Sequence, residues 1–168
     1  MNVADYGDPF GQKSLIVRHY LTFVVPKNLS RVESCYLKRI YVSTIEEGRQ
    51  ITSGDLAKIF NVKIPSAIDV LNKLEKKIYI KKEKYGYITL TQAGYKVAVE
   101  LLHAHRVFEV FLVNNLKMKS NEACRIADYV DHVLDKEVVS RLCAYLNRPM
   151  KCCHNRTIIH IGCEARSR

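Results

Sequence analysis

The chain of 168 residues has few of the features that mark non-globular or secreted proteins. Only seven glycines and four prolines are present, which excludes a collagen-like or low-complexity sequence. Six cysteines are few for a disulfide scaffold, so we expect reduced thiols, some of them facing a metal. The longest apolar stretch, near 15–26, is interrupted by Arg18 and His19 and is too short to span a bilayer. With no cleavage site after a basic start, we expect a soluble, cytoplasmic protein without a membrane partner.

Positive charge is the first functional signal. Lys and Arg number 27 against 17 Asp and Glu, a formal net charge of +10 at pH 7. Residues 27–91 hold 13 basic and 7 acidic residues, residues 92–147 hold 7 of each, and residues 148–168 hold 5 and 1. A basic segment beside a neutral one is typical of a polyanion-binding module joined to a module with another task. A basic surface kept for solubility is the alternative that charge alone leaves open.

The pattern of residues 29–91 predicts a winged helix-turn-helix domain. Apolar residues recur at helical spacing in three segments, and two short strand-like segments follow around a turn at 84–86. Helix, helix, turn, helix and a two-stranded hairpin is the order of that fold. A small α+β module that binds no nucleic acid is the alternative. The expected helices cover 30–48, 55–60 and 66–77, and the expected strands cover 50–52, 78–82 and 87–90.

Residues 92–147 are predicted to form a second, helical domain with helices over 92–116, 121–133 and 136–146. Their apolar surface, without a partner sheet, favours packing together or across a dimer axis. Residues 1–28 are expected to be an N-terminal extension and residues 148–168 a C-terminal tail. The expected helix N-caps, whose side-chain oxygens accept from free backbone N–H groups, are Ser30, Ser53, Thr91, Ser120 and Asp135.

Two consecutive helices of the second domain carry polar residues at a spacing that places them on one face of each helix. Such groups are expensive to bury unless they are paired or bound to a cation. Imidazole and carboxylate ligands suit first-row divalent ions, particularly Mn²⁺ and Fe²⁺, and a thiol shifts the preference towards softer metals. A solvated polar face with surface ion pairs is the alternative. The residues are His105 and Glu109 on the first of these helices and Cys124, Asp128, Asp131 and His132 on the next.

Seven segments occur in an order and at spacings that point to one family. They are CYLKRIY (35–41), IPSA (64–67), LEKK (74–77), LTQAG (90–94), HAHRVFE (103–109), DHVLDKEV (131–138) and PMKCCH (149–154). Over roughly residues 29–158 the chain resembles the diphtheria toxin repressor family of metal-dependent transcriptional regulators. The resemblance implies a mainly α fold with a small β-wing, in which a winged helix-turn-helix precedes an α-helical dimerisation and metal-binding domain. We expect the two-domain form, without the SH3-like domain of larger members.

The resemblance also implies two neighbouring metal sites. In the family, iron sensors typically have a sulfur ligand at each of the positions that Cys35 and Asp128 occupy here, whereas manganese sensors have a carboxylate at each. This chain has one thiol and one carboxylate at these positions. Fe²⁺ or Mn²⁺ is the expected cofactor, with Zn²⁺, Co²⁺ and Ni²⁺ as alternatives. Ile78 stands where the family usually ends a helix with glycine. One implied site consists of Cys35, Asp128, Asp131 and His132, and the other of His105, Glu109 and Cys124.

Residues of the predicted recognition helix and wing are expected to contact duplex DNA. Ser66 and Asp69 are placed to face base edges, while lysines would contact phosphates. Pro65 occupies the first turn of the recognition helix, where its missing N–H costs nothing. The expected DNA-contacting residues are Lys63, Pro65, Ser66, Asp69, Lys73, Lys82 and Lys84.

The sequence therefore favours a homodimeric, metal-activated repressor of metal-homeostasis genes that binds a palindromic operator and no small organic substrate. One alternative is a winged-helix regulator that senses no metal. The other is a di-metal enzyme, which the lack of a spare nucleophile, of a spare general base and of a Gly-rich loop disfavours. The tail contains Cys152, Cys153, His154, His160 and Cys163, which leave a separate zinc knuckle open as an alternative. Because their spacing fits no common structural zinc pattern, we expect the tail to be disordered or packed on the helical domain.

Overall fold

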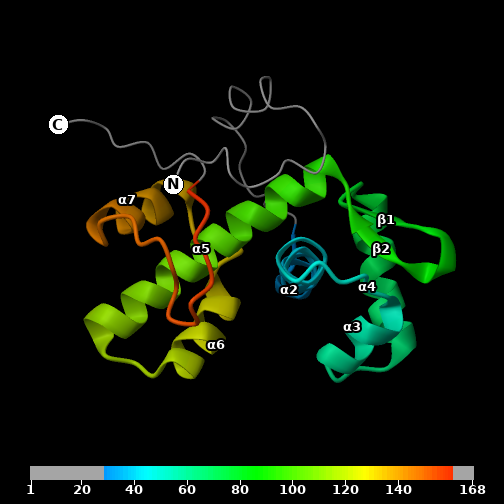
Figure 1. Ribbon diagram of the computed structural model, residues 1–168, viewed down its shortest axis with the longest axis horizontal. Coiled ribbons are helices and arrows are strands. Elements are labelled where there is room, and N and C mark those ends of the chain that lie inside the picture. The colour runs from blue at the N-terminus through cyan, green and yellow to red at the C-terminus, as the bar shows by residue number, and fades with distance from the viewer. Residues whose placement is uncertain (1–28, 161–168) are drawn as a thin grey trace. The chain divides into compact units, whose positions relative to one another are not determined.

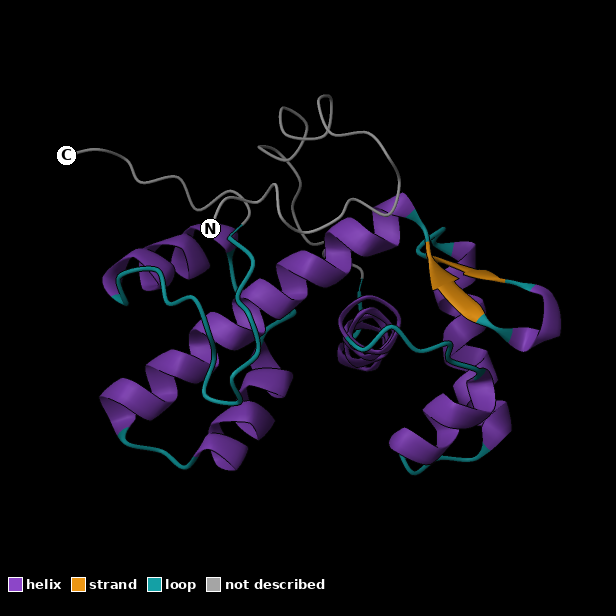
Figure 2. Ribbon diagram, viewed as in Figure 1, coloured by secondary structure: helices purple, strands orange, loops and turns teal. Residues whose placement is uncertain are grey.

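The computed structural model describes residues 29–160. This part of the chain forms two compact units, with the boundary between Val99 and Glu100. We call residues 29–99 the wing unit and residues 100–160 the helical unit. Figures 1 and 2 show that helices make up most of both units and that the described residues contain one small two-stranded sheet, in the wing unit. The predicted fold class is confirmed. The predicted extension at 1–28 and Cys163 lie outside the described residues.

The elements follow the predicted order. The wing unit contains α2 (Arg31–Tyr41), the π-helical η3 (Val42–Glu46), α3 (Ser53–Ile59), α4 (Ile64–Lys76), β1 (Ile80–Lys82), η4 (Lys84–Gly86) and β2 (Ile88–Leu90). Helix α5 (Gln92–Leu116) starts in the wing unit and continues into the helical unit, which adds α6 (Ser120–Val130) and α7 (Lys136–Tyr145).

Helix α2 begins at the predicted cap. The Glu33 N–H donates to Ser30 Oγ at 3.3 Å, and the Ser30 N–H donates to Glu33 Oε2 at 2.8 Å, which completes a capping box. Lys77 Nζ lies 2.7 Å from Glu33 Oε1 and ties the start of α2 to the end of α4. Burial acts to raise the pKa of Glu33, but hydrogen bonds from Lys77 and Ser30 outweigh it and lower that pKa. The predicted helix over 30–48 is wrong in part, because α2 ends at Tyr41 and a π-helical segment follows.

The predicted cap of α3 was wrong by one residue. Thr52, not Ser53, caps this helix: the Asp55 N–H donates to Thr52 Oγ1 at 3.2 Å, and the Thr52 N–H donates to Asp55 Oδ2 at 2.9 Å. The expected strand over 50–52 is a single bridge between Thr52 and Tyr87. Helix α4 begins at Ile64, two residues earlier than predicted, with Pro65 in its first turn as expected.

Helix α4 ends on a residue in the left-handed conformation. Ile78 has φ +60°, its N–H donates to the Glu75 carbonyl at 2.9 Å, and the Tyr79 N–H donates to the Leu74 carbonyl at 3.0 Å. This is the Schellman pattern, for which glycine is the usual left-handed residue. The Ile78 side chain is 70% exposed, so an isoleucine fits there without steric conflict with the core. The departure from the family pattern at Ile78 thus leaves the fold unchanged.

The wing is an antiparallel hairpin that connects to α5. Ile80 pairs with Leu90 and Lys82 pairs with Ile88. The apolar members of these pairs are buried, while Lys82 faces solvent. The turn η4 carries Tyr85 at φ +63° with a side chain that is 91% exposed. The wing therefore has one face in the core and one basic face in solvent.

Helices α5, α6 and α7 begin close to where the sequence predicts. Thr91 caps α5 by accepting the Gly94 N–H at 3.0 Å, and Asp135 caps α7 by accepting the Glu137 N–H at 2.8 Å. The Ser120 cap was wrong: Lys119 holds the cap position of α6 without a side-chain hydrogen bond, and Ser120 is the first helical residue. Helix α6 ends at Val130, three residues before the predicted end.

Residues 148–160 of the tail pack on the helical unit. Cys152 and Ile158 are buried with Val107 of α5 and Cys143 of α7 in one apolar cluster. The Arg106 guanidinium donates to the Thr157 carbonyl at 2.6 Å. For these residues the expectation of packing, rather than disorder, is confirmed. None of the described helices is long and apolar enough to cross a membrane.

Glu100 is expected to make stability depend on pH. Burial raises its pKa to about 7, against the weaker opposing effect of Lys136, whose Nζ lies 3.8 Å away. The folded chain keeps the Glu100 carboxyl protonated up to a higher pH than the unfolded chain does. The free energy of unfolding therefore falls as the pH rises from 4.5, the ordinary pKa of Glu, through about 7. In urea unfolding, Glu100→Gln should raise the free energy of unfolding by about 2 kcal/mol near pH 8 and have little effect near pH 4.5. Glu122→Gln, at an exposed position on α6, is the control, and equal profiles for the two variants would contradict the assignment.

Candidate metal centre and DNA interface

Helices α5 and α6 bring two carboxylates to one histidine. His105 Nδ1 lies 3.0 Å from Asp131 Oδ2 and 3.3 Å from Asp128 Oδ1. Asp128 and Asp131 are three residues apart on α6 and its C-cap, so their side chains leave the same face of the helix. The Asp131 side chain is fully buried and that of His105 is 10% exposed, while Asp128 is 40% exposed at the solvent side. We call these three residues the acid–histidine cluster.

His132 lies at the edge of this cluster. Its Nδ1 is 3.9 Å from Asp131 Oδ1 and is buried without a hydrogen-bond partner. A buried imidazole nitrogen that donates or accepts no hydrogen bond costs free energy unless a cation or a water satisfies it. This nitrogen and the oxygens of the fully buried Asp131 carboxylate are donor atoms that suit a divalent ion. The positive charge of such an ion would also offset the cost of burying the carboxylate.

A second group of metal-ligand side chains shares His105. Cys124 Sγ lies 3.5 Å from His105 Nε2, and Glu109 completes a group whose ligand atoms all fall within 4.8 Å of one another. The two ring nitrogens of His105 thus face different partners, with carboxylates at Nδ1 and a thiol at Nε2. The structure brings together the three residues that the sequence assigned to the second site.

Tail residues extend this second group in a way that the sequence did not predict. His154 Nδ1 lies 2.5 Å from Glu109 Oε1, and Glu109, Cys152 and His154 form a further group of ligand atoms within 4.8 Å. Burial raises the pKa of Cys153 to about 12, with the Glu109 carboxylate adding to the effect. The Cys–Cys–His run was the available signal, but no helical period relates it to Glu109 on α5.

Cys35, the remaining predicted ligand, lies half-buried on α2 of the wing unit. The other predicted ligands all belong to the helical unit. The place of Cys35 among them stays a prediction.

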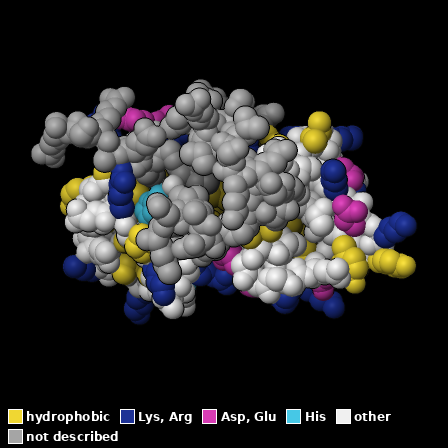
Figure 3. All heavy atoms as spheres, turned by 45° about the horizontal axis from the view of Figure 1, so that its top comes forward, with side chains coloured by type: hydrophobic (Ala, Val, Ile, Leu, Met, Phe, Trp, Pro, Cys, Tyr) yellow, Lys and Arg dark blue, Asp and Glu magenta, His cyan; other side chains and the backbone are white. Residues whose placement is uncertain are grey.

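The predicted DNA-contacting residues all lie on the exposed surface of the wing unit. Along α4 they follow the side opposite the buried Ala67, Leu71 and Leu74, and Lys84 lies in the turn of the wing. Figure 3 shows Lys and Arg side chains spread over the visible surface of the described residues, with Asp and Glu among them. The predicted DNA-contacting residues, each of them exposed, are Lys63, Pro65, Ser66, Asp69, Lys73, Lys82 and Lys84.

Among the predicted DNA-contacting residues, Lys82 has ion-pair and hydrogen-bond partners on α4. Its Nζ lies 2.9 Å from Glu75 Oε2 and 2.5 Å from Asn72 Oδ1, both on α4. These contacts tie the wing to the exposed side of the helix. Lys84, in the turn η4, is exposed.

Both units match models of known domains. The iron dependent repressor N-terminal DNA-binding domain matches residues 28–88, and the iron dependent repressor metal-binding and dimerisation domain matches residues 91–160. An HTH-type transcriptional regulator of Methanocaldococcus jannaschii, MJ0568, is 34% identical over 117 residues, which cover 67% of this chain and 90% of the relative.

Solved structures share the fold. The manganese regulator SloR superposes with a TM-score of 0.71 at 32% identity, over 77% of this chain and 60% of that one. A manganese-dependent transcriptional repressor in complex with manganese gives a TM-score of 0.70 at 26% identity, over 76% of this chain and 58% of that one. The chain thus spans about three fifths of the length of these two proteins. With a DNA-binding and a metal-binding and dimerisation domain in the family order, the chain belongs to the iron- and manganese-dependent repressor family of metal-dependent transcriptional regulators.

Proposed function

We propose that this chain is a homodimeric repressor that binds a palindromic operator when Mn²⁺ or Fe²⁺ occupies the acid–histidine cluster. The observation that carries the proposal is the convergence of Asp128, Asp131 and His105 within hydrogen-bond distance, with Asp131 fully buried. Two carboxylates and an imidazole are hard and borderline ligands, which suit these two ions better than a thiolate-rich set would. The relatives whose names include manganese support the same choice.

The residues of the cluster have separate tasks in this proposal. Asp131 is held by the end of α6, because its N–H donates to the Ala127 carbonyl at 2.9 Å, and its Oδ2 fixes the ring of His105. Asp128 is partly exposed, so a metal ion would reach the cluster from solvent on its side. A bound cation would supply positive charge that offsets the two carboxylates of α6 and would hold that helix to His105 of α5.

Dimerisation is proposed to use the apolar surface that the helical unit leaves exposed. Tyr145 is 65% exposed and packs edge-on against Phe111, and Val138 on the same helix is 51% exposed. Burial of such surface against a second copy would remove it from water. A two-fold dimer presents two α4 helices in opposite directions, which is why we propose a palindromic operator.

In the proposed complex α4 enters the major groove. Ser66 and Asp69 would face base edges, and Lys63 and Lys73 would contact phosphates on either side. Pro65 lies in the first turn of α4, where its missing N–H breaks no helical hydrogen bond. We propose that the chain acts in the cytoplasm and transforms no small substrate.

Operator binding as a function of metal tests the proposed function. Duplexes are first enriched from a random pool on the chain with Mn²⁺, and the metal-free chain is then titrated onto the enriched duplex with Mn²⁺, Fe²⁺, Co²⁺, Ni²⁺ or Zn²⁺. We expect Mn²⁺ or Fe²⁺ to raise the affinity by about tenfold or more, since coupling between two sites ordinarily changes affinity by about 5- to 150-fold. Equal affinity of the metal-free and metal-loaded chain would favour a metal-independent winged-helix regulator.

The salt dependence of DNA binding tests the role of the wing. Lys84→Ala should remove a phosphate contact and so lower the slope of log affinity against log salt by about 0.9. Lys82→Ala should change the slope less, because Lys82 already pairs with Glu75. Binding of each variant is measured by fluorescence anisotropy across a salt series. If Lys84→Ala keeps the wild-type slope, the turn of the wing does not contact DNA.

A further inference from the structure

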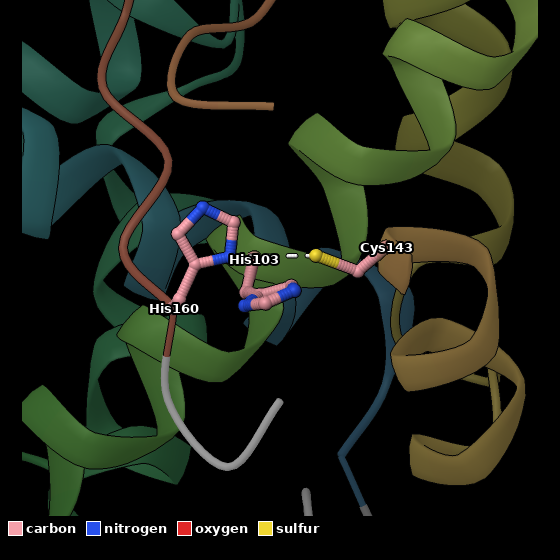
Figure 4. A group of neighbouring side chains, drawn as sticks. All are labelled: His103, Cys143 and His160. Atoms are coloured by element: carbon pink, nitrogen blue, oxygen red, sulfur yellow. Dashed lines mark hydrogen bonds between the residues drawn. The ribbon is translucent and has the colours of Figure 1, made fainter. Parts of the chain in front are cut away.

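Three side chains outside the acid–histidine cluster meet where the tail packs on the helical unit. His103 comes from α5, Cys143 from α7 and His160 from the tail, and Figure 4 shows them gathered from these three segments. Cys143 Sγ lies 3.3 Å from His160 Nδ1, and the ligand atoms of all three residues fall within 4.8 Å of one another. We call this group the tail site.

Backbone carbonyls fix the orientation of both imidazoles in the tail site. His103 Nδ1 lies 2.9 Å from the Ile159 carbonyl, and His160 Nε2 lies 3.2 Å from the Pro149 carbonyl. A carbonyl only accepts, so each of these nitrogens carries the proton. The lone pairs are then on His103 Nε2 and His160 Nδ1. This is the arrangement in which metal-binding histidines are usually held, with the second ring nitrogen donating to a carbonyl or carboxylate.

The spacing and burial of the group suit a small tetrahedral ion. Zinc bonds of about 2.3 Å to sulfur and 2.0 Å to nitrogen place neighbouring ligand atoms about 3.5 Å apart. The 3.3 Å between Cys143 Sγ and His160 Nδ1 is close to that separation. Cys143 is fully buried and His103 is 4% exposed, so two of the three ligands are already held in place by the packed core.

We propose that His103, Cys143 and His160 bind Zn²⁺ and that this ion fastens the tail to α5 and α7. The set contains a thiol and two imidazoles and no carboxylate, which is the soft-to-borderline chemistry of zinc rather than of Mn²⁺. The helical unit would then hold two metal sites of different chemistry, a structural zinc site in the tail site and an oxygen-rich site in the acid–histidine cluster. Three protein ligands leave a fourth position for water or another donor.

The effect of zinc follows from the weak internal structure of the tail. Among residues 148–160 the regular backbone pairing is a single bridge between Lys151 and Thr157. The apolar anchors of the tail are Cys152 and Ile158. A metal bond at His160 adds a fixed point beyond both anchors, and its binding free energy becomes stability of the packed tail.

Metal binding by two variants tests the proposal. Zinc is titrated into the metal-free wild-type chain, Cys143→Ser and His160→Ala in competition with a chromophoric chelator, and Co²⁺ is used as a spectroscopic probe. We expect both variants to bind about one Zn²⁺ fewer per chain than wild type. Cys143→Ser should also lose part of the thiolate-to-cobalt charge-transfer absorption. His160→Ala changes a half-buried residue of the tail, so folding of the helical unit, checked by circular dichroism, should survive.

Two comparisons separate this site from the regulatory one. Asp131→Asn should keep the tail-site zinc while losing Mn²⁺-dependent operator binding, and His160→Ala should show the reverse. Removal of zinc from wild type should speed proteolysis within 148–160 by about tenfold or more, and His160→Ala should show that faster rate with or without zinc. Equal zinc stoichiometry and affinity in wild type and both variants, or a cleavage rate that zinc does not change, would overturn the proposal, whatever the outcome for Mn²⁺.

Discussion

Asp131→Asn is expected to abolish metal-dependent operator binding while the chain stays folded. Asn has the shape of Asp but lacks its charge, so the buried position is filled and only the anionic ligand is lost. His105 keeps a neutral oxygen near Nδ1, where the carboxylate Oδ2 now lies at 3.0 Å. We expect the affinity for Mn²⁺, measured by calorimetry, to fall by about a hundredfold or more, since even residues that only orient ligands contribute ten- to a hundredfold.

Variants that differ in position or chemistry sharpen this result. Glu122→Gln removes a carboxylate from the exposed side of the same helix and should leave the Mn²⁺ affinity unchanged. His132→Ala should also abolish the response to metal, if its buried Nδ1 serves as a ligand. Cys35→Ser should weaken soft metals most, because a thiolate ligand would be lost. Wild-type Mn²⁺ affinity in Asp131→Asn, with an intact response on DNA, would show that the acid–histidine cluster is not the regulatory site.

The sequence could predict which ligand side chains share a face of α5 and which share a face of α6, because helical periodicity alone relates them. His105 and Glu109 are four residues apart on α5, and Asp128 and Asp131 are three apart on α6, so each pair shares a face wherever the helix packs. No such period relates His154 or His160 to α5. Their positions depend on the path of the tail after α7, which is set by burial of Cys152 and Ile158 rather than by local sequence. The sequence could therefore name the tail's cysteines and histidines as possible zinc ligands, but only the structure shows which residues of α5 and α7 they meet.

The order of the helices was likewise predictable, and their ends less so. Long α5 matched its predicted bounds because its apolar pattern is sustained and Thr91 is a clear cap. At α3 two hydroxyl residues are adjacent, and the capping box with Asp55 selects Thr52 over Ser53. At the end of α4, Ile78 adopts a left-handed conformation that its residue type disfavours, because the buried Tyr79 and the wing behind it determine the direction of the chain.

Gly94→Ala is expected to cause a large loss of stability in the wing unit. A Cβ atom at Gly94 would lie 1.8 Å from the Tyr79 carbonyl oxygen and 2.7 Å from the carbonyl carbon. These are backbone atoms, and the Tyr79 carbonyl also accepts the Thr91 N–H at 3.0 Å, so no side-chain rotation can relieve the overlap. The start of α5 and the start of the wing would have to move apart. We expect the free energy of unfolding to fall by about 3 kcal/mol, the upper range for overpacking.

Gly54→Ala is the matched control for this prediction. Gly54 also lies in the first turn of a helix, α3, but a Cβ there would meet only Thr52 Oγ1 at an ordinary 3.7 Å. Since alanine favours helix over glycine by about 0.8 kcal/mol, this variant should be as stable as wild type or more so. Urea unfolding of the two variants and wild type measures both effects. Because the overlap at Gly94 lies where the wing joins α5, the Gly94→Ala chain should also bind the operator more weakly even with saturating Mn²⁺. Equal stability of the Gly94 and Gly54 variants would mean that the close approach of α5 to Tyr79 contributes nothing to the fold.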